Sequence, residues 1–346
     1  MSRLAALALL TISIACSEPP QQSEPTPGPV LVERTHTTMG SELRVTAWTA
    51  DRAAAEAAFE EVFREFDRLD AVMSVWREGS EVLQLNAAAG ERPVRIGADV
   101  RETLAVARQV SDWTDGKFDV TFGALSGLWK FDHDQDDRIP DSAAVRARLP
   151  LIDYRRLEVN DEAGTAFLQT KGMSVHLGGI GKGYAVERGA EILRRRGVRD
   201  FLIQSGGDLY ASGRRGDRPW RIGIRDPRGP ANLSFAALDA TDETVSTSGD
   251  YERAFISGGR RYHHIIDPDL GEPTRDTRSV TIVARRATLA DALSTGVVLL
   301  GPSRGLALIE QLQDVEGVIV TARNEVLVSS GLKDRLIRLA PPTDAP

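Results

Sequence analysis

The stretch HLGGIGKGYAVERG at residues 176–189 places five glycines and one lysine in front of a predicted helix. Glycine-rich loops before helices often bind phosphates, because backbone N–H groups there can approach an anion closely. Two standard phosphate-binding patterns do not fit. A P-loop requires serine or threonine after Lys182, where the chain has Gly183, and a dinucleotide fingerprint starting at Gly179 requires a small residue where Tyr184 stands. The loop therefore serves another chemistry.

Composition narrows the class of protein. With 346 residues, of which 41% are hydrophobic and 27% charged, the chain can bury one large core or two moderate ones. The net charge of −7 comes from 43 basic and 50 acidic residues that are spread along the sequence without a basic block. This distribution argues against nucleic acid as a partner.

The N-terminal stretch MSRLAALALLTISIAC has the layout of a secretion signal and is too short to span a bilayer. Cys16 is the only cysteine, so no disulfide can form within one chain, and it lies where a lipoprotein signal carries its lipidated residue. Ala15 fits that pattern, whereas Ser13 replaces the usual leucine. Lipidation is the prediction, and plain secretion with a free cysteine is the alternative.

The segment after Cys16 is rich in Pro, Ser and Glu and cannot pack a core, which predicts a flexible tether. We therefore expect a signal peptide at 1–15, a tether at 16–30 and one folded domain at 31–341. The chain would be exported and anchored through lipidated Cys16 on the periplasmic side of a bacterial membrane.

Hydrophobic periodicity predicts an α+β fold within this domain. Strands and helices are mixed without regular βαβ repetition, which argues against a doubly wound sheet. There is no internal repeat and no interior linker. Helices are expected at 51–70, 99–112 and 183–196 and from about 288 onward; strands are expected at 43–48 and 200–204, with several more between 220 and 283.

The acidic segment DHDQDDRIPDSA at 132–143 has aspartates at the spacing of a calcium loop. Asp137 occupies the position that needs a glycine bend, and Ala143 occupies the position of the closing bidentate carboxylate. The segment is therefore predicted to be a solvated surface loop.

Two short segments carry side chains suited to catalysis. In YHHIIDPDLGEPT at 262–274, His264 precedes an apolar pair and a turn that contains proline and glycine, which suits a general base at the end of a strand. A partly buried histidine that bonds the turn is the alternative. In ADALSTG at 290–296, Asp291 and Thr295 lie on one face of a helix and could form half of a magnesium site, or simply an exposed face.

Taken together, seven segments in this order resemble the ApbE family, the FAD:protein FMN transferases. The resemblance covers nearly all of the chain after residue 34. The segments are TMGSELRV (38–45), MSVW with SEVLQLN (73–86), KFDVTFGALSGLW (117–129), HLGGIGKGYAVE (176–187), IQSGGDLYASG (203–213), HHIIDPDLGEP (263–273) and ADALSTGVVLLG (290–301).

The resemblance implies an ApbE-like, T-fold-like mixed β-sheet core packed with helices. It also implies an enzyme that binds FAD with Mg²⁺, cleaves the diphosphate and attaches FMN through a phosphoester bond to a threonine of an exported redox protein. Carried over residue by residue, the metal ligands would be the carbonyl of Gly179 together with Asp291 and Thr295. The cofactor contacts would be Met39, Trp76, Lys117, Phe118, Asp119, His176, Lys182 and Ile265.

His176 departs from the family pattern, which has aspartate before the L-G-G motif. An imidazole can still hydrogen-bond FAD. His264 would take the proton from the acceptor threonine, because a histidine with a pKa of about 6.5 accepts a proton at neutral pH. His263, adjacent on a strand, would point to the opposite face. An FAD pyrophosphatase and a non-catalytic flavin-binding lipoprotein are the alternatives.

Overall fold

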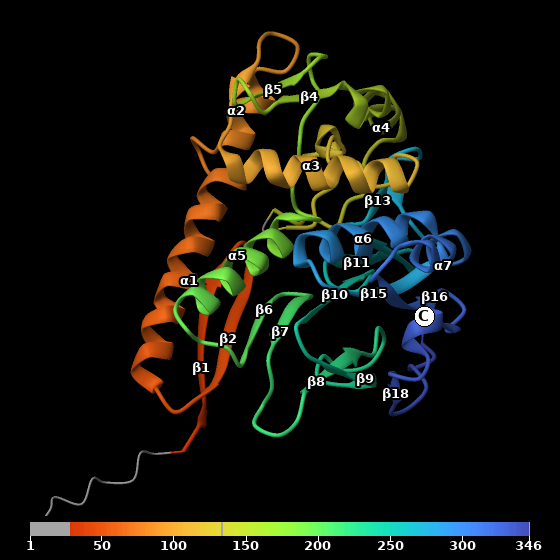
Figure 1. Cartoon of the computed structure of the whole chain (residues 1–346). Coiled ribbons are helices and arrows are strands. Elements are labelled where there is room, and N and C mark those ends of the chain that lie inside the picture. Colours follow the sequence, from red (N-terminus) through yellow and green to blue (C-terminus); the bar gives the residue numbers. More distant parts are fainter. Residues whose placement is uncertain (1–27, 133, 346) are drawn as a thin grey trace, which may run out of the picture.

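The computed structural model describes residues 28–132 and 134–345, which form an α+β fold (Figure 1). Its central sheet has the strand order β1-β2-β6-β7-β10-β15-β16-β17, and every neighbouring pair in it is antiparallel. These strands are β1 (Val30–Thr38), β2 (Ser41–Thr49), β6 (Phe201–Ser205), β7 (Asp208–Ser212), β10 (Glu243–Gly249), β15 (Thr277–Ala284), β16 (Glu316–Thr321) and β17 (Val326–Val328).

Smaller sheets and hairpins surround the central sheet. They consist of β18 (Ile337–Arg338), β9 (Ser234–Ala240) and β8 (Trp220–Arg225); β3 (Val94–Arg95), β5 (Thr165–Leu168) and β4 (Leu157–Asn160); β11 (Ala254–Ser257) with β12 (Arg260–His263); and β13 (Ile266–Asp267) with β14 (Glu272–Pro273).

Seven α-helices and four short 3₁₀ helices complete the described part. The α-helices are α1 (Arg52–Met73), α2 (Glu81–Ala87), α3 (Ala98–Trp113), α4 (Ser142–Arg148), α5 (Gly181–Arg195), α6 (Ala287–Leu300) and α7 (Pro302–Gln311). The 3₁₀ helices are Gly123–Leu125, Leu149–Leu151, Tyr154–Arg156 and Ser330–Leu332.

The central sheet is covered on both faces. Side chains alternate along a strand, so in β15 Val280 and Ile282 join the core under the helices, whereas Val283 joins the core shared with β8 and β9. Every residue of β15 is consequently buried. Figure 1 shows α1 lying alongside β1 and β2, with α5 next to α1 and α6 on the other side of α5.

The helices expected from periodicity are present as α1, α3, α5 and α6, within about three residues of the predicted bounds. Gly197 ends the α5 region with a φ of +81°, a conformation that favours glycine. Periodicity did not indicate the shorter helices α2, α4 and α7.

The predicted signal peptide, Cys16 and most of the predicted tether lie outside the described residues. Among the residues that the structure does describe, no helix combines the length and apolar character needed to cross a membrane.

Helices α5 and α6 approach each other closely at Gly183. A Cβ atom at this position would lie 2.4 Å from the carbonyl oxygen of Ala287 and 2.6 Å from the Cβ of Asp291. With hydrogen in place of a side chain, the Gly183 N–H instead donates to Asp291 Oδ2 at 2.8 Å. Gly183, the fourth glycine of the HLGGIGKG segment, therefore joins that segment to the helix that carries Asp291.

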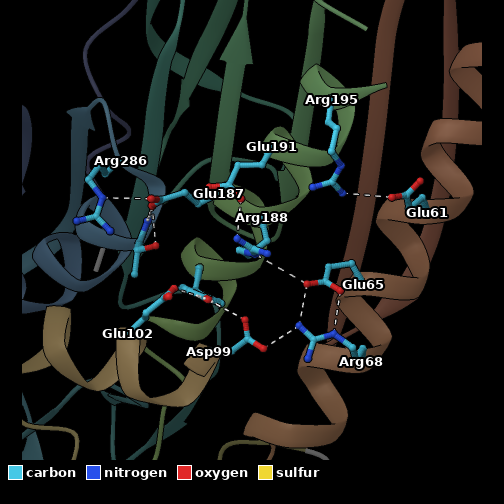
Figure 2. Close-up of polar contacts among 12 residues, drawn as sticks. Glu61, Glu65, Arg68, Asp99, Glu102, Glu187, Arg188, Glu191, Arg195 and Arg286 are labelled. Atoms are coloured by element: carbon cyan, nitrogen blue, oxygen red, sulfur yellow. Dashed lines mark hydrogen bonds and ion pairs between the residues drawn. The ribbon is translucent and has the colours of Figure 1, made fainter. Parts of the chain in front are cut away.

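Charged side chains of α5 form hydrogen bonds and ion pairs with α6 and with α1 (Figure 2). Glu187 of α5 accepts hydrogen bonds from the N–H and hydroxyl of Thr288, which caps the first turn of α6, and it also pairs with Arg286. Toward α1, Arg188 lies 3.9 Å from Glu65, and Arg68 bridges Glu65 and Asp99 of α3. These contacts hold the position of the glycine loop relative to three helices.

Replacing Gly183 with alanine is expected to lower the free energy of unfolding by at least about 2–3 kcal/mol, because the new methyl group overlaps backbone that has no room to move. Gly181→Ala is the matched control in the same helix. Its Cβ would meet its nearest neighbour at an ordinary 3.8 Å, so the stability should change by less than about 1 kcal/mol. Urea unfolding monitored by circular dichroism measures both, and equal stabilities would contradict the close contact.

Candidate active site

A cavity of about 330 Å³ opens where the glycine loop, α6, the end of β10 and the β11–β12 hairpin meet. Its volume is within the range of small-molecule sites. Eleven of the twelve site residues predicted from the sequence line it: Trp76, Lys117, Phe118, Asp119, His176, Gly179, Lys182, His264, Ile265, Asp291 and Thr295. Segments far apart in the chain therefore converge on one place.

Met39 is the exception. It occupies the turn between β1 and β2 with a φ of +49°, and its methyl group lies 3.8 Å from the point where a Cβ on Gly181 would be. The side chain packs against the core, whereas the next residues, Gly40 and Ser41, line the cavity. Contact between Met39 and FAD stays a prediction, and the turn presents its neighbours to the cavity in its place.

The hydroxyl of Thr295, the carboxylate of Asp291 and the backbone of Gly179 come together at one end of the cavity. Thr295 Oγ1 would be 3.3 Å from a Cβ on Gly179, so the loop backbone runs directly past this hydroxyl. Ser248 Oγ lies 3.0 Å from Thr295 Oγ1 and orients it from β10. Asp291, one helical turn before Thr295, is 3% exposed and uses only Oδ2 for its bond to Gly183.

This donor set suits a hard cation such as Mg²⁺, which takes carboxylate, hydroxyl and carbonyl oxygens and keeps several positions for water or substrate. Burial, reinforced by the nearby carboxylate of Asp208, raises the pKa of Asp291 from 3.8 to about 7. A cation would relieve this cost. In the part of the chain that the structure describes, no group of three or more His, Cys, Asp or Glu side chains forms a complete cage for a metal. A bound metal would therefore depend on the substrate for further ligands.

Both lysines of the cavity wall are paired with carboxylates. Lys182 Nζ lies 3.1 Å from Asp208 Oδ2; although burial opposes it, Asp208 and Asp291 raise the pKa of Lys182 above its ordinary value. Lys117 Nζ lies 2.8 Å from both carboxylate oxygens of Asp267 and 2.8 Å from Asp269. Both lysines are thus held in place as permanent cations.

At the other end of the cavity, two aromatic side chains suit the flavin contact that the resemblance implied, whereas the Asp119 carboxylate is engaged in the wall. Trp76 is 50% exposed at the rim, and Phe118 is buried in the wall, so both can contact a flat ring. The carboxylate of Asp119 instead accepts hydrogen bonds from Thr121 and from the Tyr154 N–H. Burial raises the pKa of Asp119 despite these bonds. Its carboxylate therefore organises the wall, and contact with FAD stays a prediction.

His176 stands where the family pattern has aspartate, and its side chain provides a hydrogen-bond acceptor at this position. Its Nδ1 accepts a hydrogen bond from the Gly178 N–H at 3.0 Å, as a carboxylate could, and its ring lies 5.3 Å from that of Phe122. Burial lowers the pKa of His176, so the imidazole is neutral at neutral pH. A neutral imidazole at this position leaves the cavity wall without the negative charge that an aspartate would carry.

The two adjacent histidines of the hairpin point in opposite directions, as the pleat of a strand predicts. His263 is buried, accepts from the Ile265 N–H and contacts the Thr274 carbonyl oxygen at 2.9 Å. His264 lines the cavity, and its buried Nδ1 has no hydrogen-bond partner among the described residues. His264 is thus the histidine available to a substrate.

The expected pKa of about 6.5 for His264 is wrong for the ligand-free site. Burial, with Arg253, His263 and Lys182 adding to it, lowers the pKa of His264 to about 3. The imidazole is therefore neutral over the whole physiological range, but it is a weaker base than the sequence suggested.

The lining also includes polar residues that the sequence analysis did not assign to the site, among them Asp132, Asp208, Ser248 and Arg253. The segment that starts at Asp132 was predicted to be a solvated surface loop. That prediction holds for its exposed middle, but its first residues form part of the cavity wall, where Asp132 pairs with Arg253. Asp208 lies in the IQSGGDLYASG segment, which could have drawn attention to it; Arg253 follows no recognisable motif.

Comparison with known proteins agrees with this site. The ApbE family model matches residues 39–319. An FAD:protein FMN transferase of Klebsiella pneumoniae (strain 342) is 32% identical over 84% of this chain and 90% of its own length. One of Treponema pallidum (strain Nichols) is 33% identical over 88% of each chain. The crystal structure of the ApbE protein of Thermotoga maritima superposes with a TM-score of 0.81 at 29% identity, covering 88% of this chain and 99% of that one.

These matches define a class of flavin-transferring enzymes, and the chain belongs to the ApbE family. The flavin transferase ApbE of Vibrio cholerae also shares the fold, with a TM-score of 0.78 and 26% identity, over 89% of this chain and 99% of that one. The family and the α+β fold class predicted from the sequence are therefore confirmed.

Asp291→Asn should stabilise the chain when no metal is added. The folded state holds a proton on Asp291 up to pH 7, whereas the unfolded chain releases it near pH 4, so the stability of the natural chain falls as pH rises between these values. Asparagine does not ionise, so its stability has no such pH dependence, and its amide oxygen can still accept the hydrogen bond from the Gly183 N–H. The melting temperature of the variant should exceed that of the natural chain by about 2 °C or more at pH 8, and by less at pH 5.

Asp161→Asn serves as the control, because that side chain is 85% exposed. If the melting temperatures of the natural and Asp291→Asn chains differ by the same amount at pH 5 and pH 8, ionisation of Asp291 does not destabilise the folded state.

Proposed function

We propose that this chain transfers FMN from FAD to a threonine of an exported redox protein, with Mg²⁺ bound and AMP released. The enzyme class follows from the family: the chain is an FAD:protein FMN transferase, as its relatives are named. Magnesium, the threonine and the exported partner are the finer part of the proposal. One observation carries it: a single cavity is lined both by oxygen-bearing groups suited to a hard cation and by a histidine nitrogen that has no hydrogen-bond partner among the described residues.

The residues fit the parts of FAD. Trp76 and Phe118 offer aromatic surface to the flavin ring, and the cationic Lys182 is suited to the diphosphate beside the donor end. When bound, magnesium would neutralise the charge of the diphosphate and the charge that develops on the departing AMP. Asp291, Thr295 and the Gly179 carbonyl would hold it, because all three residues line the cavity and the Gly179 backbone runs past the Thr295 hydroxyl.

His264 would complete the transfer as a general base. The acceptor threonine oxygen forms a bond to the phosphorus of the FMN half, the bond from that phosphorus to the AMP oxygen breaks, and the threonine proton passes to His264. The cations Arg253 and Lys182 help to lower the pKa of His264. An anionic diphosphate near them would offset their effect and strengthen the base in the complex.

One incubation separates the three candidate functions. The chain is mixed with FAD, Mg²⁺ and a peptide that carries an acceptor threonine. A transferase gives flavin-labelled peptide with AMP, a pyrophosphatase gives free FMN with AMP, and a binding protein leaves FAD unchanged. Free FMN with unlabelled peptide across a panel of acceptors would refute transfer.

His264→Ala should lower the rate of FMN transfer by about 10²–10⁴-fold, the usual loss for a general acid or base, while FAD affinity stays near that of the natural chain. His263→Gln is the control, since a side-chain amide can replace the bond to the Thr274 carbonyl oxygen. Stopped-flow transfer and flavin fluorescence titration measure the two quantities. A His264 variant that fails mainly by not binding FAD would show that the histidine builds the pocket.

We also propose that Cys16 is lipidated and tethers the domain to a membrane. Support comes from its place after a short apolar signal and before a Pro- and Ser-rich segment. A single acyl chain gives only weak, reversible membrane binding, whereas two chains, or one chain with a second signal, anchor a protein stably. Cys16 would therefore anchor the domain by itself only if its lipid group carries more than one acyl chain.

Cys16→Ser should move the protein from the membrane fraction to the soluble fraction of fractionated cells. A variant that is still processed and still sediments with membranes would contradict lipid anchoring at Cys16. Cytoplasmic protein that retains its N-terminal segment would contradict export.

A further inference from the structure

Arg253 is the only arginine among the described residues that line the cavity. It lies directly before β11, and the His264 N–H donates to its carbonyl oxygen at 3.2 Å. Since Ala254 pairs with His263 in this antiparallel hairpin, Arg253 stands opposite His264. Side chains of directly opposed residues project from the same face, with Cβ atoms roughly 5 Å apart. The guanidinium and the imidazole therefore share one face of the hairpin.

That face looks onto the cavity wall. Phe255 and Tyr262, the next residues on the same side, stack on each other with ring centroids 5.3 Å apart. They also stack on Phe131 and Trp129, both of which line the cavity. The direction of the Arg253 side chain is thus set by an aromatic stack, and it places the guanidinium beside His264.

Of the cations in the described wall, Arg253 is the least committed. Lys117 has three carboxylate oxygens at 2.8 Å, and Lys182 pairs with the buried Asp208. Arg253 pairs with Asp132, and both side chains of this pair are partly exposed, at 35% and 29%. Ion pairs that water can reach contribute little to stability, so this one can be exchanged at little cost.

We infer that Arg253 is a further substrate-binding residue, which exchanges Asp132 for the phosphoryl oxygens of FAD next to His264. The inference rests on the proposed function. A guanidinium presents two parallel N–H donors that match two phosphate oxygens, a geometry that an ammonium group cannot offer. Asp132 holds the side chain in place while the cavity contains no diphosphate.

The exchange also links binding to the base. Arg253 and Lys182 both act on the His264 imidazole from the cavity side, and His263 acts from the hairpin itself. The carboxylates that face the same space are Asp132, Asp134, Asp208, Glu252 and Asp291. A diphosphate on Arg253 would place two negative charges between this guanidinium and the imidazole at the point where the proton is to be accepted.

The test compares the binding of FAD and of riboflavin, which has the same ring system without phosphates. Arg253→Gln should weaken FAD binding by about 10–100-fold, the loss expected for a charge-assisted bond to phosphate, and leave riboflavin binding unchanged. Arg253→Lys should lose less FAD affinity, since lysine keeps the positive charge but lacks the two parallel N–H donors of the guanidinium. Asp132→Asn should not weaken FAD binding and should tighten it by up to about 5-fold, because a competing anion is removed.

Arg304→Gln is the matched control. Arg304 pairs with Asp115 at 2.8 Å, and neither residue lines the cavity. Fluorescence titration gives the affinities, and thermal melting verifies that each variant is folded.

Three outcomes in the variants would overturn the inference. Equal losses for FAD and riboflavin would show that Arg253 only shapes the wall. Weaker FAD binding in Asp132→Asn would show that the ion pair itself is required. Normal FAD affinity with slowed transfer in Arg253→Gln would show that Arg253 contacts the acceptor and not FAD.

Failure of this inference can be told apart from failure of the proposed function. A natural chain that binds no FAD would refute both, whereas normal FAD affinity in Arg253→Gln would refute this inference alone.

Discussion

The rest of the site depends on the contact between α5 and α6 at Gly183. An N–H donor at the start of one helix meets a buried carboxylate on the other at 2.8 Å, and no side chain larger than hydrogen fits between them. This contact sets the distance of the glycine loop from α6. It thereby brings the backbone of Gly179 against Thr295, more than a hundred residues later in the chain. Without that approach, the glycine loop would not lie against the face of α6 that carries Asp291 and Thr295.

The second constraint is electrostatic. Among the described residues, the cavity is lined by more carboxylates than cations: Asp119, Asp132, Asp134, Asp208, Glu252 and Asp291 against Lys117, Lys182 and Arg253. Both lysines are already paired with carboxylates. Burial, together with Asp208, raises the pKa of Asp291 to about 7. A cation bound beside Asp291 would offset the cost of burying this carboxylate.

Local patterns in the sequence predicted what depends on neighbouring residues. Helical spacing located α1 and α6, and the alternation of a strand separated the roles of His263 and His264. What failed depends on contacts between distant segments. The pairing of Asp132 with Arg253 spans 121 positions and follows from the stacking of two aromatic segments. The inward turn of the Asp119 carboxylate and the lowered pKa of His264 follow from burial, which a single sequence does not reveal.

The most direct test of the account is the position of the metal. Crystals of the chain grown with FAD and Mn²⁺ in place of Mg²⁺ would show the ion by its anomalous scattering. The account predicts one peak bonded to the Gly179 carbonyl, a carboxylate oxygen of Asp291, Thr295 Oγ1 and the diphosphate of FAD. A peak that lies elsewhere in the cavity, with Asp291 bonded only to the Gly183 N–H, would contradict it.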